Sequence, residues 1–200
     1  MTSTSEHSQR GLRALGDKII RAVDIKPGEA RAAFLSFAYF FCLLCAYYIV
    51  RPVRDEMGVT LGKDFLKHLF TYVFIVMLAA VPLFGWIVSA VEKRRVVGAV
   101  YGFFIATMLV FWLTLRANPE SRTVAASFFI WASVFNLFVI SLFWSVMSDL
   151  WNTEQAKRLY GFFAAGGSVG AFAGPVVTQV FVRLIGPNNL LPVSAVFLVA

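Results

Sequence analysis

The sequence predicts an all-α membrane protein, and three observations lead to this fold class. Of the 200 residues, 59% are hydrophobic, only 14% are charged, and the apolar residues lie in runs long enough to cross a bilayer. Soluble domains carry roughly 25% charged residues, and a soluble chain of this length could not bury so many apolar side chains. The formal charge of +7 falls between the runs, which favours a role in membrane orientation over nucleic-acid binding.

Six apolar runs are expected to form transmembrane helices, because about 20 apolar residues cross the hydrocarbon core. They cover residues 32–50, 69–91, 96–115, 123–147, 159–182 and 190–200. The sixth run is too short to cross and is still apolar at Ala200. We therefore expect a piece of a longer protein, cut inside its sixth span, with residues 32–200 as one transmembrane bundle.

The distribution of Lys and Arg predicts the orientation of this bundle. Eleven of these residues lie on the side that holds the N-terminus, and seven lie on the other side. Cytoplasmic loops carry the excess of positive charge, so we expect the N-terminus in the cytoplasm.

Residues 1–31 are expected to form a cytoplasmic segment with an amphipathic helix at about 11–25. Its apolar side chains share one helical face: Leu12, Leu15, Ile19 and Val23. Such a helix lies on the inner leaflet, with its basic residues near anionic lipid, or packs on the cytoplasmic ends of the bundle. The sequence favours neither arrangement.

Charged residues at the end of the first span form a candidate anion site. Arg51 and Arg54 share a helical face, and Asp55 lies at the i+4 position from Arg51, where it can form an ion pair. Two guanidinium groups can hold a phosphate or carboxylate by bidentate contacts. The alternative is a solvated helix end with snorkelling arginines. Pro52 and the adjacent tyrosines favour a segment held at a defined depth.

The fifth span carries glycines that predict a close helix contact. Gly161, Gly170 and Gly174 precede Pro175 inside one apolar run. Glycine lets another backbone approach closely in a membrane, and proline leaves one carbonyl without its helical partner. We expect these four residues to act in packing and gating, as in a helix that lines a moving pathway.

The junction of the fourth and fifth spans is a candidate cytoplasmic latch. Thr153 is the expected N-cap of the fifth span, and Asp149 could pair across the loop with Lys157 and Arg158. Such ion pairs can hold one conformation. The alternative is that these charges only set topology and cap the helices.

The sequence shows no pattern typical of an enzyme or of a metal or cofactor site. Cys42 and Cys45 form a C-x-x-C, but they lie inside an apolar span, where thiols react poorly, and we interpret them as packing residues. His7 and His68 are far apart, and no catalytic triad or metal-ligand cluster is evident. We therefore expect no enzymatic activity, no metal and no cofactor.

A weak internal symmetry divides the bundle into two three-helix units of opposite topology. The second and fifth spans correspond in this scheme, and each contains a proline, Pro82 and Pro175. Prolines in corresponding segments are typical of inverted repeats in transporters.

The chain resembles the N-terminal half of a major facilitator superfamily transporter. The spacing of Gly161, Gly170, Gly174 and Pro175 is similar to a fifth-helix motif of antiporters in that family, although Thr178 and Gln179 replace its trailing glycines. The resemblance implies a six-helix bundle made of two inverted three-helix repeats, with its sixth span truncated here and a second six-helix half as its partner.

A closer resemblance is to the bacterial and plastid ATP/ADP translocase branch. It is carried by residues 48–55 (Tyr-Ile-Val-Arg-Pro-Val-Arg-Asp), 142–144 (Leu-Phe-Trp) and 154–160 (Glu-Gln-Ala-Lys-Arg-Leu-Tyr). The resemblance places Arg54 at the substrate-contacting lysine of that family. It also places Ala132 at the family's fourth-span glutamate, with Ser133 and Asn136 as the nearest polar residues.

Together these observations predict a secondary active transporter of the bacterial inner membrane that works by alternating access. It would exchange or co-transport an anionic, nucleotide-like solute, bound by Arg51, Arg54, Asp55 and Asn136. An efflux or flippase-type transporter of an amphipathic solute is an alternative, because the spans are rich in Phe and the fourth-span carboxylate is missing. A non-transporting membrane scaffold or a membrane enzyme is a second alternative. The expected partners are the lipid bilayer, the solute and the second half, and no nucleic acid.

Overall fold

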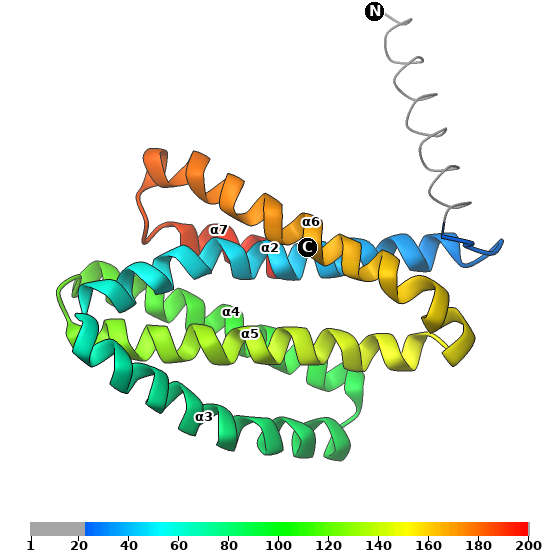
Figure 1. Cartoon of the computed structure of the whole chain (residues 1–200), viewed down its shortest axis with the longest axis horizontal. Coiled ribbons are helices and arrows are strands. Elements are labelled where there is room, and N and C mark those ends of the chain that lie inside the picture. Colours follow the sequence, from blue (N-terminus) through cyan, green and yellow to red (C-terminus); the bar gives the residue numbers. More distant parts are fainter. Residues whose placement is uncertain (1–22, 200) are drawn as a thin grey trace, which may run out of the picture.

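The structure confirms the predicted all-α fold class. The computed structural model describes residues 23–199, except for the side chains of Lys93 and Arg94. Within these residues every regular element is a helix, in the order α2 (Ala30–Thr60), α3 (Lys63–Ala90), α4 (Lys93–Ala117), α5 (Arg122–Leu150), α6 (Thr153–Ile185) and α7 (Leu190–Val199) (Figure 1). The amphipathic helix expected at about 11–25 lies mainly outside the described residues.

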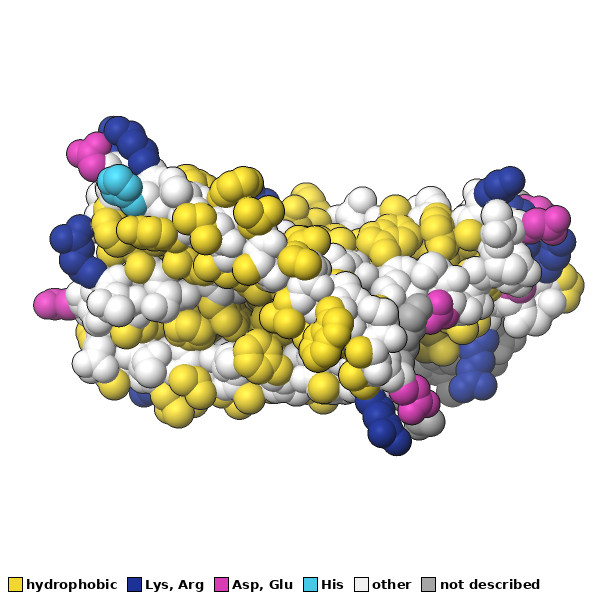
Figure 2. All heavy atoms as spheres, turned by 90° about the horizontal axis from the view of Figure 1, so that it is seen from below, with side chains coloured by type: hydrophobic (Ala, Val, Ile, Leu, Met, Phe, Trp, Pro, Cys, Tyr) yellow, Lys and Arg dark blue, Asp and Glu magenta, His cyan; other side chains and the backbone are white. Residues whose placement is uncertain are grey.

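Five of the helices, α2 to α6, are long and apolar enough to cross a membrane, and α7 is a shorter apolar helix of 10 residues. Apolar side chains cover much of the face shown in Figure 2, and the charged side chains gather mostly near its two ends. This distribution is typical of a protein whose middle lies in lipid.

The helices extend beyond the apolar runs that predicted them. α2 continues through Pro52 to Thr60, because the charged residues after the first span keep the helical backbone. The prediction of Thr153 as N-cap of α6 is wrong. Asn152 is the N-cap, and it forms a capping box with Gln155, in which each side chain accepts a hydrogen bond from the other residue's backbone N–H.

Short connections make successive helices run in alternate directions (Figure 1). α2, α4 and α6 start at one end of the bundle, called here the amino end, and α3, α5 and α7 start at the opposite end, called the far end. The set α5–α7 therefore begins at the far end, whereas the set α2–α4 begins at the amino end. This alternation matches the expected inverted units. Gly62 and Gly186, with φ of 90° and 81°, allow two of the turns at the far end.

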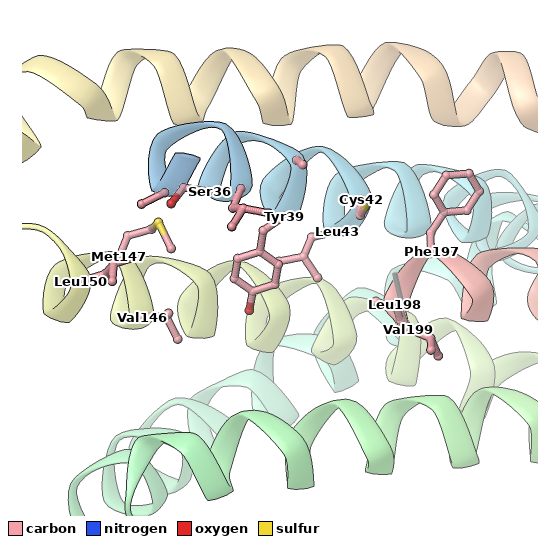
Figure 3. A pocket seen from close by; sticks show the side chains of 13 residues that line it. Ser36, Tyr39, Cys42, Leu43, Val146, Met147, Leu150, Phe197, Leu198 and Val199 are labelled. Carbon is pink, nitrogen blue, oxygen red and sulfur yellow. The ribbon is translucent and has the colours of Figure 1, made fainter. Parts of the chain in front are cut away.

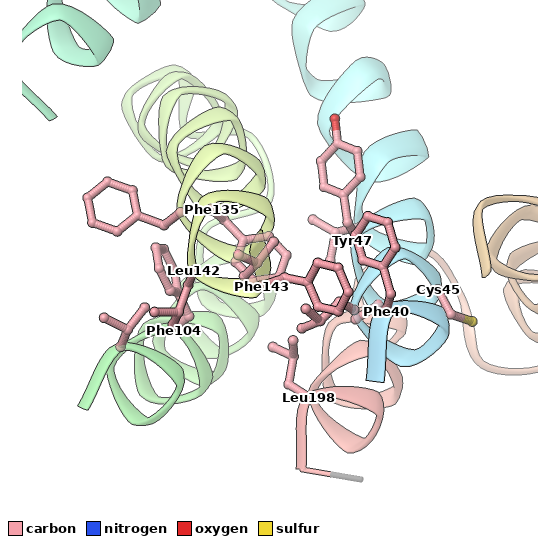
Figure 4. Close-up of a cluster of buried hydrophobic side chains, with 14 of the residues drawn as sticks. Phe40, Cys45, Tyr47, Phe104, Phe135, Leu142, Phe143 and Leu198 are labelled. Atoms are coloured by element: carbon pink, nitrogen blue, oxygen red, sulfur yellow. The ribbon is translucent and has the colours of Figure 1, made fainter. Parts of the chain in front are cut away.

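α2 is the central helix of the bundle. It contacts α6 most extensively and also packs against α5 and α7, whereas α3 lies at the outside, where it packs mainly against α5 (Figure 1). Aromatic side chains dominate the contact between α2 and α5. The rings of Phe40 and Phe143 are stacked with centroids 4.1 Å apart (Figure 4). A second ring pair, Phe104 of α4 and Phe135 of α5, joins α5 to α4.

Candidate functional site

The three charged residues predicted as an anion site lie together within the last three turns of α2. Both Nε and Nη2 of Arg54 donate to Oδ1 of Asp55, at 3.0 and 2.6 Å. Nε of Arg51 lies 3.7 Å from Oδ2 of the same carboxylate. The predicted i, i+4 pairing of Arg51 with Asp55 is therefore present. Asp55 contacts both guanidinium groups at once.

Aromatic rings support both guanidinium groups. Arg54 lies over the ring of Phe129 on α5, with its Cζ 5.1 Å from the centroid, and Arg51 lies over Tyr48, at 5.4 Å. Gly58 permits the first contact, because a Cβ at this position would be 2.8 Å from Cε2 of Phe129. The side chain of Arg54 is 18% exposed, against 45% for Arg51. Arg54 is thus the better fixed of the two cations.

The α5 residues expected near the site have different surroundings. Ala132 is fully buried in the hydrophobic core, and the hydroxyl of Ser133 donates to the carbonyl oxygen of Phe129 on the preceding turn. Asn136 is half-buried. Within residues 23–199 no hydrogen bond joins its side chain to either arginine. The position at which the family resemblance places a glutamate, Ala132, is therefore apolar in this chain.

The glycines of α6 form its closest contact, and the partner is α2. A Cβ added at Gly170 would overlap the backbone of Phe41. A Cβ added at Gly174 would lie 2.6 Å from the Cβ of Tyr48. Tyr48 is also the ring under Arg51, so this contact reaches the residues predicted as an anion site. Cys45 is buried and points toward α6 at the same place (Figure 4).

Two glycines that sequence reasoning missed belong to the same face. A Cβ at Gly166 would lie 2.5 Å from the carbonyl oxygen of Phe37, and one at Gly167 would lie 2.5 Å from the ring of Phe40. Gly166 precedes Gly170 by four residues, the small-xxx-small spacing that could have identified it.

Gly161 does not pack as expected. It is exposed, and a Cβ there would meet nothing within 4 Å. Pro175 lies inside α6 and is exposed.

At the amino end, Arg158 binds the segment that precedes α2. Its Nη2 donates to both carboxylate oxygens of Glu29, at 3.2 Å each, and its Nη1 donates to the carbonyl of Asp24. The side-chain amide of Gln155 donates to the same carboxylate at 2.9 Å. The hydrogen bond from Gln155, together with Arg158, lowers the pKa of Glu29. Sequence reasoning had not singled out Glu29. Asp149 and Lys157 are exposed at this end.

A mostly apolar cavity lies apart from the charged residues. It has a volume of about 620 Å³ and lies between α2, α5 and the end of α7 (Figure 3). Its lining is mostly apolar and includes Tyr39, Cys42, Met147 and Phe197. The hydroxyl of Tyr39 forms a hydrogen bond with that of Tyr101 on α4. Among the described residues no three His, Cys, Asp or Glu side chains are grouped as metal ligands.

Comparison with known proteins gives a family and two distant relatives. The profile of the Major Facilitator Superfamily matches residues 6–199. The chain is 25% identical to ADP,ATP carrier protein 1 of Rickettsia bellii (strain RML369-C), in an alignment that covers 74% of this chain and 35% of that protein. The protein of the same name from Rickettsia conorii (strain ATCC VR-613 / Malish 7) gives the same identity and coverage. No solved structure matches the chain at a significant level.

The chain spans about a third of the length of these curated relatives, the aligned share being 35%. The family profile covers almost the whole chain, and the helical bundle has the membrane-length helices that a family member requires. These findings indicate a multi-pass membrane protein with the fold of a membrane transporter. The chain belongs to the Major Facilitator Superfamily of membrane transporters.

Proposed function

We propose that this protein is a secondary active transporter that exchanges or co-transports an anionic, nucleotide-like solute by alternating access. The observation that carries the proposal is the pair of guanidinium groups of Arg51 and Arg54, held together by one carboxylate on the central helix. A charged cluster inside a transporter helix is by default a substrate or ion site.

The chemistry of the cluster suits a phosphate-bearing solute. The planar guanidinium presents two parallel N–H donors that match phosphate or carboxylate oxygens. Arg54 is restrained by Phe129, so less conformational freedom is lost when an anion binds. The relatives are named as ADP,ATP carriers, which favours a nucleotide or a related phosphorylated solute.

In this proposal the bundle is one of two halves that rock about a site between them. Asp55 orients the two arginines, and Asn136 lines the pathway from α5. The glycine face of α6, with Pro175 behind it, lets α6 and α2 move as one closely packed pair. Asp149, Lys157 and Arg158 contribute to a latch at the amino end, which the excess of Lys and Arg places in the cytoplasm. The membrane is a bacterial inner membrane.

A second function, efflux or flipping of an amphipathic solute, is favoured by two observations. Ala132 and its surroundings are apolar where resemblance assigned a carboxylate, and the 620 Å³ cavity has no charged side chain in its lining. A solute with a large apolar part would fit such a lining better than a nucleotide would.

Uptake into proteoliposomes that hold the full-length protein tests both functions. The panel contains labelled ATP, ADP, smaller phosphorylated solutes and a fluorescent phospholipid. We expect uptake of a phosphorylated solute, abolished in Arg54→Ala and retained in Arg116→Ala, which removes an exposed arginine outside the cluster. Unchanged uptake in Arg54→Ala would remove this residue from the site. Movement of the phospholipid alone would favour the second function.

A further inference from the structure

At the proposed anion site, the carboxylate of Asp55 already contacts both guanidinium groups. The Nε–Nη2 edge of Arg54 donates both of its N–H groups to Oδ1 of Asp55, at 3.0 and 2.6 Å. The second oxygen, Oδ2, faces Nε of Arg51 at 3.7 Å. A phosphate held in bidentate fashion would use this edge of Arg54. The carboxylate therefore takes the donors that the proposed solute needs.

We propose that Asp55 is an internal competitor of the transported anion, which must be displaced for the anion to bind and which returns when the anion leaves. The inference rests on the function proposed above and names the residue that sets the affinity of that site. In this role Asp55 lowers the affinity of the site for the solute, because its carboxylate competes for the guanidinium groups. A residue that only oriented the arginines would raise that affinity.

The two sides of the ion pair differ in how firmly they are held. Arg54 is 18% exposed and lies over the ring of Phe129, whereas the side chain of Asp55 is 49% exposed. The cation is therefore the more restrained partner, and the half-exposed carboxylate has room on its solvent side to rotate away. Exposed ion pairs contribute little to stability, so an incoming anion can break these contacts at small cost. The carboxylate stays tethered beside the site and speeds release of the anion.

The neighbouring residue provides a matched control for the charge of Asp55. Glu56 is exposed, carries the same charge one position further along α2, and forms no ion pair within residues 23–199. A general effect of negative charge on anion binding would be relieved by Glu56→Gln as well as by Asp55→Asn. Competition at the guanidinium groups would be relieved only by Asp55→Asn.

Calorimetry of the purified full-length protein with inorganic pyrophosphate tests the inference. This probe carries two phosphate groups and no base, so its binding reports on phosphate recognition, and the comparison with Arg54→Gln assigns that binding to the guanidinium groups. The variants are Asp55→Asn, Asp55→Glu, Glu56→Gln and Arg54→Gln, with Asp55→Ser as a second charge-removing variant if Asp55→Asn does not fold. We expect Asp55→Asn to bind pyrophosphate about two- to fivefold more tightly than the wild type. Asp55→Glu and Glu56→Gln should stay within about twofold of the wild type, and Arg54→Gln should lose binding.

The outcomes separate this inference from the function on which it rests. Equal or weaker binding in Asp55→Asn, with binding lost in Arg54→Gln, would overturn the competition and leave the anion site in place. Pyrophosphate bound by no variant, or bound equally by Arg54→Gln and the wild type, would overturn both. If Glu56→Gln increased the affinity for pyrophosphate as much as Asp55→Asn, the competition would also be overturned. The gain would then come from the lower negative charge of the whole region.

Discussion

Gly170 of α6 lies directly against the backbone carbonyl of Phe41 on α2, so closely that a Cβ at this position would overlap the carbonyl oxygen. The obstacle is backbone, which cannot move aside as the end of a flexible side chain can. The separation of α2 and α6 at this level is therefore set by the absence of a side chain at residue 170.

Gly170→Ala is expected to destabilise the bundle, because overpacking a tight contact costs about 1–3 kcal/mol. Gly161→Ala is the matched control, since a Cβ there meets nothing within 4 Å and alanine favours a helix by up to about 1 kcal/mol. Thermal unfolding of the two variants in detergent measures the difference. Equal melting temperatures would show that α2 and α6 separate easily at this level.

The ring of Phe129 is expected to fix Arg54 for anion binding. Phe129→Leu removes the face over which the guanidinium lies at 5.1 Å, a contact worth about 0.5–2 kcal/mol. The KM for the proposed anionic solute should rise severalfold. Phe135→Leu changes a fully buried ring on the same helix, which stacks on Trp131 and lies under no arginine among residues 23–199, and it controls for lost packing. A similar rise of KM in both variants would mean that Phe129 acts only through stability.

The number and order of the helices could be predicted from the sequence, because uninterrupted apolar runs of about 20 residues are typical of membrane-spanning helices. Their ends could not be predicted in the same way. Arg51, Arg54 and Asp55 interrupt the apolar pattern, but they keep helical backbone and carry α2 on to Thr60. Hydropathy locates the apolar part of a helix, but it does not locate the residue at which the helix ends.

The glycine contact shows what a single sequence could and could not predict. Gly170 and Gly174 were predicted to pack closely, and they do. Gly161 lies in the same apolar run and was predicted to pack with them, but it precedes Gly170 by nine residues. At 3.6 residues per turn, nine residues are two and a half turns, so Gly161 points to the opposite side of α6. Gly166 follows the four-residue spacing and shares the packed face.

Contacts between distant segments could not be predicted because nothing local encodes them. The ring of Phe129 meets Arg54 from another helix, and Glu29 meets Arg158 from a segment 129 residues away in the chain. In each case the sequence showed one charged residue of the contact and not its partner. The i, i+4 pair of Arg51 with Asp55 was predictable, because a helix fixes that distance.

Ala132→Glu is expected to destabilise the protein strongly. The methyl group of Ala132 is fully buried in the hydrophobic core, and an unpaired buried charge costs about 3 kcal/mol or more. Ser127→Glu introduces the same side chain at an exposed position of α5 and serves as the control. Thermal unfolding and the yield of folded protein measure the loss. A stable Ala132→Glu variant would indicate that this position faces a polar space.

The pairing of Glu29 with Gln155 and Arg158 is expected to make stability depend on pH. The pKa of Glu29 is lowered below its usual value of 4.5, first by the hydrogen bond from Gln155, then by that from the backbone N–H of Lys26 and by Arg158. A carboxyl whose pKa is lower in the folded than in the unfolded state stabilises the fold above the unfolded value, and this contribution is lost as the pH falls through the folded value. Glu29→Gln should therefore melt below the wild type at pH 7, and the two should converge as the pH falls below 4.5. Glu120→Gln, at an exposed residue of the far end, should match the wild type at every pH. A gap between Glu29→Gln and the wild type that persists unchanged in acid would show that the ionised carboxylate does not hold α6 to the segment before α2.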